Sequence, residues 1–196
     1  MQRRLEHTRN LLLDAAEEVF ARKGFDAAAL EDIADSAGYT RGAIYSHFGS
    51  KAELFLAVVE RQRQRFLEGF TDVVDSFANL DDLQADRFAD RWGDLLAQGS
   101  DRASLGYEFT LFLLRNPDAR ERVASQREET AHALADYIAK GVARLGGELT
   151  IDSVDLARVI LAANDGVTLH SLLDGHDVYR PFLQMVIANI VVAGPH

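Results

Sequence analysis

The residues best suited to chemistry in this 196-residue sequence lie close together, before the end of its first third. Arg41, Tyr45, His47 and Lys51 carry hydrogen-bond donors, and no acidic residue occurs from Ser36 to Ala52. Positive charge combined with hydroxyl and imidazole donors is suited to binding phosphate groups. An arginine can also pair with the base edge of guanine, and an aromatic ring can contact the methyl group of thymine.

Two helices are expected to support this segment. The first is amphipathic, with Leu12, Ala16 and Phe20 on one face, and it ends at Gly24. Glycine ends a helix readily because it enters the left-handed cap conformation at little cost. A short helix over about residues 30–37 follows, with acidic residues in its first turn and a second glycine after it.

A third helix carries the candidate residues. Thr40 is expected to cap it, with Ile44 and Phe48 facing inward. The exposed face of this helix then holds Arg41, Gly42, Tyr45 and Ser46. The next helix opens with Ser50 and Glu53 at the spacing of a capping box.

The order helix, glycine turn, short helix and capped third helix is that of helix-turn-helix DNA readers. In such proteins the second helix of the motif lies in the major groove, where Gly42 would let the backbone approach the duplex. This spacing alone is only moderately specific, because many helical proteins have a glycine turn between short helices. Tyr45 could equally pack locally, and Arg41 could be a solvated charge.

The segment from about Leu12 to Val59 resembles the DNA-binding head of the tetracycline-repressor (TetR) family. This segment covers about a quarter of the chain, and the similarity lies in its runs LLDAAEEVFARKGF and LEDIADSAGYTRGAIYSHFGSKAELF. The residues that match the family pattern are Ala15, Ala16, Phe20, Gly24, Ile33, Ala34, Ala37, Gly38, Tyr45, Phe48, Lys51, Glu53 and Leu54.

The resemblance implies a role for each exposed residue of the motif. Thr40, Arg41 and Gly42 would open the recognition helix, and Lys51 would bind a phosphate at the start of the fourth helix. The residues expected to contact DNA are therefore Thr40, Arg41, Gly42, Tyr45, Ser46, His47 and Lys51.

One departure from the family pattern concerns the second helix. Many members carry threonine or serine before it, where this sequence has Ala28 and Ala29. The missing cap would cost about 1 kcal/mol and one phosphate contact. That loss bears on the affinity for DNA and leaves the class of protein unchanged.

The rest of the chain is also helical in pattern. We predict an all-α protein of about nine helices, with a helix-turn-helix head over residues 1–50 and a helical ligand-binding and dimerisation domain over residues 51–196. The first 116 residues contain no proline, which suits long helices. The resemblance implies that the fourth helix, with an irregularity expected at Gly69, connects the two parts.

In the TetR family the body binds a small molecule, so the resemblance implies an effector. Aromatic and polar residues of the body are the candidates to bind it, although an aromatic residue at helical spacing belongs more often to the core. These candidates are Phe88, Trp92, Tyr107, Phe109, Phe112, Tyr137, Asn164 and His170.

The last two expected helices, over about residues 153–174 and 178–193, are apolar on more than one face. Such helices need burial on more than one side, which favours a homodimer over a single deep core within one chain. The residues expected at the dimer interface are Ile160, Val167, Leu172, Phe182, Val186 and Ile190.

The charge of −10 is unevenly distributed along the chain. Residues 1–65 hold ten basic and ten acidic residues, so the whole excess of acid lies in the body. An acidic body would turn the head toward DNA, although the charge could simply keep the body soluble. With no cysteine, no secretory signal and no apolar run long enough for a membrane, a cytoplasmic protein without membrane contact is expected.

Other function classes find little support. The sequence lacks the G-x-S-x-G, G-x-x-x-x-G-K-[ST] and H-E-x-x-H motifs, and its six histidines form no metal pair at helical spacing. We therefore expect no enzyme, no metal site and no cofactor. An interaction module that has lost DNA binding should carry acidic or bulky residues at Arg41, Gly42 or Lys51, and this sequence does not. A repressor is the commoner case in the family, but these residues do not exclude an activator.

Overall fold

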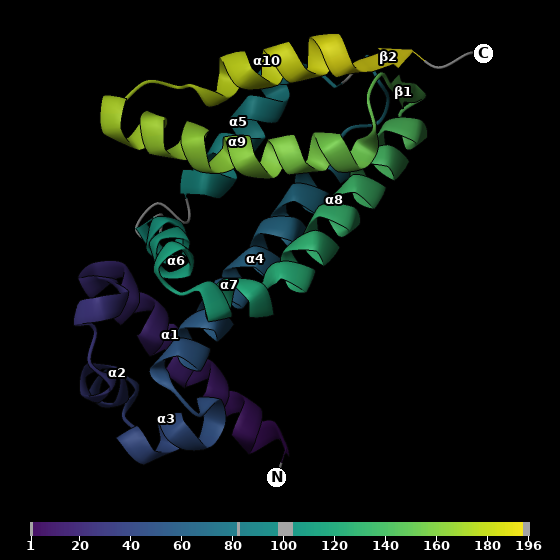
Figure 1. Cartoon of the computed structure of the whole chain (residues 1–196). Coiled ribbons are helices and arrows are strands. Elements are labelled where there is room, and N and C mark those ends of the chain that lie inside the picture. Colours follow the sequence, from purple (N-terminus) through teal and green to yellow (C-terminus); the bar gives the residue numbers. More distant parts are fainter. Residues whose placement is uncertain (1, 82, 98–103, 194–196) are drawn as a thin grey trace. The chain divides into compact units, whose positions relative to one another are not determined.

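The computed structural model describes residues 2–81, 83–97 and 104–193, and within them the chain is helical as predicted. These ranges hold ten helices and one pair of three-residue strands (Figure 1). None of the helices described is long and apolar enough to cross a membrane.

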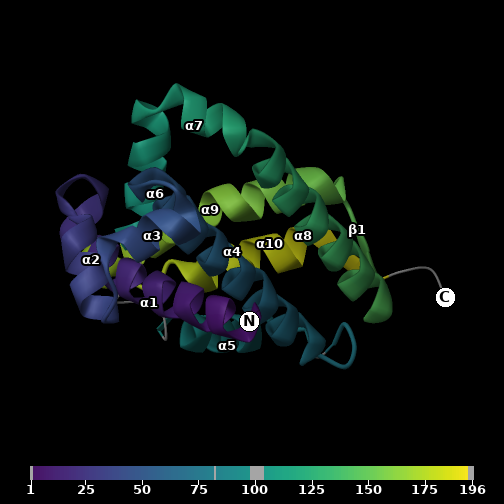
Figure 2. The ribbon, with the colours of Figure 1, turned by 90° about the horizontal axis from the view of Figure 1, so that it is seen from below.

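The helix-turn-helix lies within the first four helices, and Figures 1 and 2 both show α1, α2 and α3 grouped together. The elements are α1 (Gln2–Ala27), α2 (Leu30–Ala37), α3 (Arg41–Phe48) and α4 (Lys51–Asp75). The predicted end of the second helix is confirmed, because Gly38 follows α2 in the left-handed conformation with φ 70° and ψ 29°. Gly24, with φ 75° and ψ 169°, interrupts α1 but does not end it, since helical structure resumes and continues to Ala27. The irregularity expected at Gly69 is absent, because one glycine costs only about 1 kcal/mol in a helix.

Two compact units make up the chain. The N-terminal unit comprises residues 1–65 and 99–117, and the C-terminal unit comprises residues 66–98 and 118–196. The boundary between the two units falls inside α4, which contributes its first part to one unit and its second part to the other. The division of function between residues 1–50 and 51–196 is a separate matter and stays a prediction.

The core of the N-terminal unit forms where α1, α2, α3 and the start of α4 bury their apolar faces. Phe20, Ile33, Ile44 and Phe55 are completely buried there. Helix α6 (Ser104–Arg115) packs onto α1 in the same unit, with the ring of Phe112 lying 5.5 Å from that of Phe55.

The C-terminal unit is built on the second half of α4 and on helices that pack around it. Its helices are α5 (Ala85–Ala97), α8 (Ala124–Arg144), α9 (Ser153–Asp174) and α10 (Tyr179–Ile190). The short helix α7 (Pro117–Arg122) begins with a proline in its first turn, where the missing amide hydrogen costs no helical bond. Phe70, Phe77, Trp92 and Leu156 are among the residues of the buried core of this unit.

A short antiparallel sheet was not predicted. Strand β1 (Gly147–Leu149) pairs with β2 (Val191–Ala193), and Glu148 lies opposite Val192. Three residues per strand are too few to leave an alternating pattern in the sequence. The sheet ends α10 at Ile190, before the end of the predicted helix at residue 193.

A buried carboxylate joins α1 to α4 in the N-terminal unit. Glu17 is 2% exposed and forms ion pairs with Arg61 and with Arg65, whose Nη1 lies 3.1 Å from Glu17 Oε1. Arg61 also pairs with the exposed Asp14 at 2.7 Å. Removing one partner of a buried pair leaves the other charge without compensation, which is strongly destabilising.

We therefore expect Glu17→Gln to lower the free energy of unfolding by about 3 kcal/mol. This loss is at the lower end for a broken buried ion pair, because Asp14 still compensates the charge of Arg61. Urea unfolding at fixed protein concentration measures the change. The matched control is Glu18→Gln, because Glu18 forms only an exposed pair with Arg22. Equal losses in the two variants would show that the buried network does not stabilise the unit.

Candidate functional site

The exposed first turn of α3 is positioned by a cap and an anchor. Thr40 lies in extended conformation, and its Oγ1 accepts a hydrogen bond from the Ala43 amide at 3.3 Å. Ile44, one turn further on, is completely buried and holds the helix against the core. Arg41 and Gly42, which lie between these two residues, are exposed.

Arg41 is held by two neighbours on this face. Its Nη1 donates to Glu31 Oε1 of α2 at 2.6 Å, and its Nη2 donates to the Tyr45 hydroxyl at 2.9 Å. The guanidinium carbon also lies 5.3 Å from the centre of the Tyr45 ring. The hydrogen bond with Tyr45 and the charge of Glu31 both raise the pKa of Arg41. Arg41 therefore stays charged and is oriented along the surface of α3.

The remaining predicted residues of α3 surround this pair. Gly42 and Ser46 are exposed and His47 is half-buried. A Cβ atom added at Gly42 would meet only the Thr40 Oγ1, at 3.6 Å. Packing within the unit therefore does not require glycine at this position, which leaves the surface free for close approach from outside.

Lys51 lies at the start of α4 and contacts the end of α1. Its Nζ donates to the backbone carbonyl of Asp26 at 3.1 Å and lies 4.8 Å from the centre of the Phe25 ring. In the free protein this lysine thus tethers two helices of the N-terminal unit, a role that the sequence did not indicate.

The start of α2 has no side-chain cap from Ala29, as its residue type requires. The carboxylate of Asp32 accepts the Ala29 amide at 3.4 Å and the Lys23 ammonium at 2.8 Å. The bond from Lys23 is the largest cause of the lowered pKa of Asp32. Part of the expected capping loss is therefore recovered from within the helix.

A second candidate site is a cavity in the C-terminal unit. It holds about 820 Å³ of space free of protein atoms, including the space at its opening. Three of the residues predicted to bind an effector line it, namely Phe88, Trp92 and Asn164. The other lining residues include Phe70, Val74, Ile138, Leu156, Ile160, Tyr179, Phe182 and Val186.

The polar groups of this cavity are clustered. The Tyr179 hydroxyl donates to the Asn164 side-chain oxygen and lies 3.0 Å from Thr168 Oγ1. Burial raises the pKa of Tyr179, so the phenol stays neutral. The sequence analysis missed Tyr179. Its only signal was an aromatic residue at the start of the last apolar helix.

The other predicted effector residues do not line the cavity. Tyr107, Phe109 and Phe112 belong to α6 in the N-terminal unit. Tyr137 packs beside Phe70 and donates to the Thr71 carbonyl at 2.8 Å, while His170 is exposed next to Asp174. Of these aromatic residues, Phe112 is buried in the core of its unit and Tyr137 packs beside the core residue Phe70. The sequence analysis gave core packing as the more common role of an aromatic residue at helical spacing.

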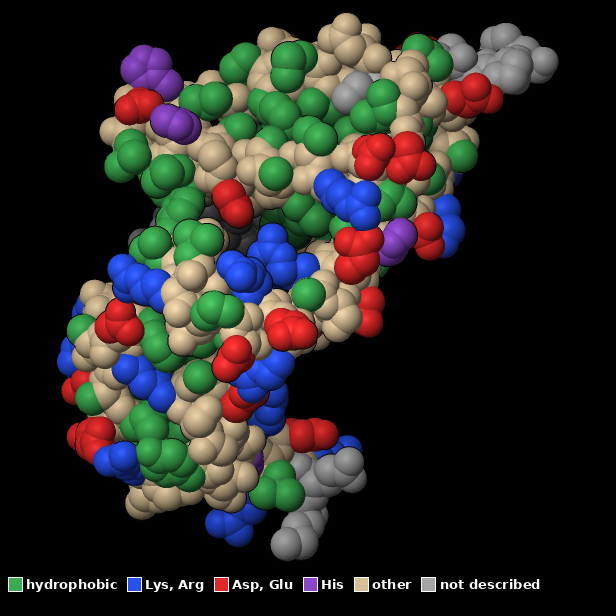
Figure 3. Space-filling model, viewed as in Figure 1, with side chains coloured by type: hydrophobic (Ala, Val, Ile, Leu, Met, Phe, Trp, Pro, Cys, Tyr) green, Lys and Arg blue, Asp and Glu red, His purple; other side chains and the backbone are tan. Residues whose placement is uncertain are grey.

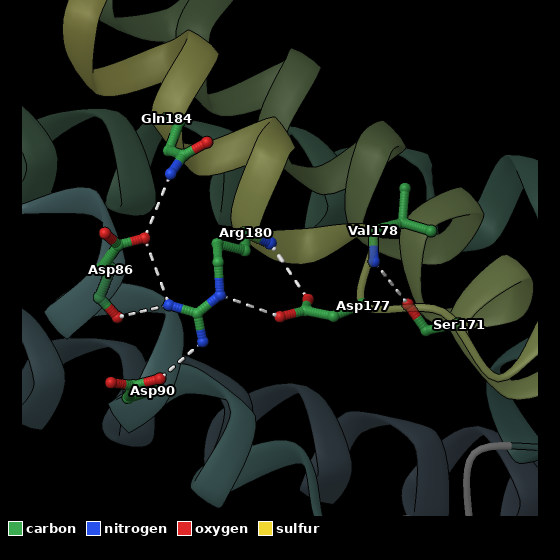
Figure 4. Close-up of polar contacts among 7 residues, drawn as sticks. All are labelled: Asp86, Asp90, Ser171, Asp177, Val178, Arg180 and Gln184. Carbon is green, nitrogen blue, oxygen red and sulfur yellow. Dashed lines mark hydrogen bonds and ion pairs between the residues drawn. The ribbon is translucent and has the colours of Figure 1, made fainter.

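Arg180, at the start of α10, joins this helix to α5 through ion pairs (Figure 4). Its guanidinium lies 2.6 Å from Asp90 and 3.2 Å from Asp86, both on α5, and 3.3 Å from Asp177. Gln184, one turn further along α10, also donates to Asp86 at 3.1 Å. These bonds raise the pKa of Arg180 and fix α10 beside the helix that carries Phe88 and Trp92.

The residues predicted at a dimer interface occupy different places. Val167 and Val186 are buried in the core of their own unit, and Ile160 and Phe182 line the cavity. Leu172 is 53% exposed, whereas the side chain of Ile190 lies outside the described part. Figure 3 shows hydrophobic side chains gathered over α9 and α10. The large exposed ones are Val159, Leu172, Leu173, Met185 and, on β2, Val192.

No group of three or more His, Asp or Glu side chains in the described ranges could hold a metal ion. The structure offers two candidate sites, namely the exposed polar face of α3 and the apolar cavity of the C-terminal unit. This combination is the one expected of a helix-turn-helix regulator with a separate body.

Comparison with known proteins agrees with this class. The family described as "Bacterial regulatory proteins, tetR family" matches residues 12–58. The transcriptional activator FasR of Mycolicibacterium smegmatis is 44% identical over 64 residues, which are 33% of this chain and 29% of FasR. The chain thus spans less than a third of that relative.

Solved structures extend the likeness to the body. A putative TetR-family regulator from Mesorhizobium loti superimposes with a TM-score of 0.72 at 18% identity, over 94% of this chain and 95% of the other. The multidrug binding protein EbrR, complexed with imidazole, gives a TM-score of 0.61 at 26% identity, over 92% and 87%. Residues 12–58 thus match the head that the TetR-family model describes, and the chain as a whole has the fold of solved TetR-family regulators.

Proposed function

We propose that the chain is a ligand-responsive repressor, which binds a palindromic operator as a homodimer and is released by a small molecule. The observation that carries the proposal is the exposed first turn of α3, with Arg41 oriented on it by Glu31 and Tyr45. FasR is an activator, so activation of transcription is the second candidate. A reporter gene placed behind the operator distinguishes the two by the sign of the change.

In the proposed complex α3 enters the major groove and its first turn meets the bases. Arg41 would leave Glu31 to bind guanine, while Tyr45 and Ser46 contact the neighbouring base edge or phosphate. Thr40, Gly42 and His47 would lie along the backbone of the duplex, and Lys51 would exchange its carbonyl partner for a phosphate. Residues 1–50 would thus form the DNA-binding part.

The proposed dimer is formed by α9 and α10, within the part over residues 51–196. We place its interface on the exposed side chains Val159, Leu172, Leu173 and Met185, because Val167 and Val186 are already covered within their own unit. The two-fold axis of such a dimer would match the axis of a palindromic site.

The proposed effector occupies the cavity of the C-terminal unit. EbrR, a relative by structure, was solved with imidazole bound, which supports a small-molecule effector here. Helix α4 carries Lys51 at one end and the cavity residues Phe70 and Val74 near the other. An effector that binds the DNA-incompetent state more tightly would shift the equilibrium through this helix, typically by about 1–3 kcal/mol.

The first experiment is selection of bound fragments from a random DNA pool, followed by titration of the best fragment at two salt concentrations. We expect a palindromic sequence that binds well above random DNA and weakens with salt, because phosphate contacts release counterions. A folded dimer that enriches no sequence would contradict the proposal.

Arg41→Ala should weaken binding to the selected site by about 1–3 kcal/mol if Arg41 pairs with guanine. Fluorescence anisotropy of labelled DNA measures the loss, with random DNA of the same length alongside. Arg22→Ala, which removes an exposed arginine from α1, is the matched control. An equal loss on random DNA would instead assign Arg41 to a phosphate, and unchanged binding would remove it from the interface.

Glu31→Gln should raise the affinity for random DNA severalfold and raise that for the operator less. The carboxylate of Glu31 occupies Arg41 in the free protein and repels phosphates, so it suppresses non-specific binding. The ratio of the two affinities, measured beside Glu18→Gln, tests this. A variant that loses operator affinity alone would show that Glu31 serves only to orient Arg41.

Met185→Glu should shift the protein to monomer, because it places a charge on the proposed apolar interface. Sedimentation velocity measures the mass, and operator binding should fall together with dimerisation. Leu114→Glu, at an exposed leucine of α6, is the matched control. If Met185→Glu remains dimeric, the interface lies elsewhere.

A further inference from the structure

The cavity in the C-terminal unit has a narrow chemical character. Aromatic and aliphatic side chains form nearly all of its lining, and the two polar lining residues, Asn164 and Tyr179, are uncharged. These two residues lie next to each other, because the Tyr179 hydroxyl donates a hydrogen bond to the Asn164 side-chain oxygen. An occupant therefore meets hydrocarbon on most of its surface and hydrogen-bonding groups in one place.

We infer that the effector is an uncharged, largely apolar molecule, which directs one hydrogen-bonding group toward Asn164 and Tyr179. That this molecule controls DNA binding rests on the proposed function, whereas its binding in the cavity does not. Three kinds of occupant differ in what the cavity offers them, namely an anion, a cation and a neutral molecule.

An anionic occupant would find no basic side chain among the residues that line the cavity. Arg180 follows the lining residue Tyr179, but its guanidinium is bonded to Asp86, Asp90 and Asp177 (Figure 4). Arg144 precedes the lining residue Leu145 and donates to the carbonyls of Phe77 at 3.1 Å and Val74 at 3.2 Å. A buried anion without a partner is strongly disfavoured.

A cationic occupant would find no carboxylate in the cavity lining and no open aromatic cage. Asp165 follows Asn164 and hydrogen-bonds with it, and burial raises the pKa of Asp165, but its carboxylate is not part of the lining. The indole of Trp92 is surrounded by other rings, with Phe66 at 5.2 Å, Phe70 at 5.7 Å, Tyr179 at 6.3 Å and Phe88 at 6.4 Å. These rings stabilise each other by stacked, tilted and edge-to-face contacts and are not arranged around a cation.

A neutral occupant suits the same lining. Its apolar surface gains free energy from leaving water for the hydrocarbon lining. A polar group elsewhere in the cavity would lose its hydrogen bonds to water, so it is best placed near Asn164 and the Tyr179 hydroxyl, which lies 3.0 Å from Thr168 Oγ1. The cavity thus sets both the charge of the ligand and the direction of its polar end.

The first test uses two fluorescent probes that share one skeleton. N-phenyl-1-naphthylamine is neutral, and 8-anilinonaphthalene-1-sulfonate adds a sulfonate. With the full-length protein and no DNA, we expect one neutral probe per chain and binding of the sulfonate weaker by about tenfold or more. Equal binding of the two probes would overturn the inference.

The second test uses two competitors of nearly identical shape. Tert-butylbenzene is neutral, and phenyltrimethylammonium replaces its central carbon by a charged nitrogen. We expect only the neutral compound to displace the naphthylamine probe. Displacement by the ammonium ion at similar concentration would assign the cavity to cations and overturn the inference.

Two pairs of variants locate the binding. Ile160→Phe fills the cavity and should weaken the neutral probe about tenfold or more, whereas Ile151→Phe, at an exposed isoleucine, should not. Asn164→Leu should weaken 4-tert-butylphenol more than tert-butylbenzene, with Asn189→Leu on the exposed side of α10 as control. Melting temperatures identify any variant that fails to fold, and the Asn164 pair then decides.

Unchanged probe affinity in a folded Ile160→Phe variant would overturn the assignment to this cavity, as would equal effects of Asn164→Leu on the phenol and the hydrocarbon. Operator titrations with and without the neutral probe form a separate arm. A neutral ligand that binds the cavity but leaves operator affinity unchanged would contradict the proposed regulation and leave the ligand class intact. A protein that binds the operator but no neutral probe would contradict the inferred ligand class and leave the proposed DNA binding intact.

Discussion

The packing of Phe55 is the contact that joins α1, α4 and α6 in the unit that carries the proposed DNA-binding face. Its completely buried ring lies within 5.0 Å of Phe20, 4.9 Å of Phe25 and 5.5 Å of Phe112, so one side chain of α4 contacts both α1 and α6. Lys51 adds a bond from the start of α4 to the end of α1. Helix α3 precedes α4 in sequence, packs against α2 and buries Ile44 completely, which leaves its opposite face exposed.

Charge is compensated differently on the surface and near the cavity. On α3, Arg41 is held by one exposed carboxylate, and both side chains remain more than half exposed. Such a pair contributes little to stability and can be exchanged for DNA. Near the cavity, Arg180 is bonded to three carboxylates, and its exchange for a ligand would leave those carboxylates without a partner. The protein therefore keeps a replaceable cation where it meets phosphate and a fixed cation beside its apolar interior.

Sequence reasoning reached the helices and the exposed face of α3 because their signals are local. Gly38 and Thr40 set the end of α2 and the start of α3 through their own backbone or side chain, so neighbours in sequence suffice. The cavity could not be predicted in the same way, since its lining comes from α4, α5, α8, α9, α10 and both strands. Phe112 and Trp92 look alike along the chain, yet one packs in the N-terminal unit and the other lines the cavity. Only tertiary packing separates them.

Gly42 has a consequence for how such a regulator changes over generations. A side chain added there would meet only Thr40 Oγ1 at 3.6 Å, and glycine is itself a poor helix former. Folding therefore places little demand on this position, and recognition of DNA is left as the selecting force. In a duplicated gene, a substitution at this residue would change the DNA sequence that is bound and leave the buried core unaltered. DNA specificity and fold would then evolve separately.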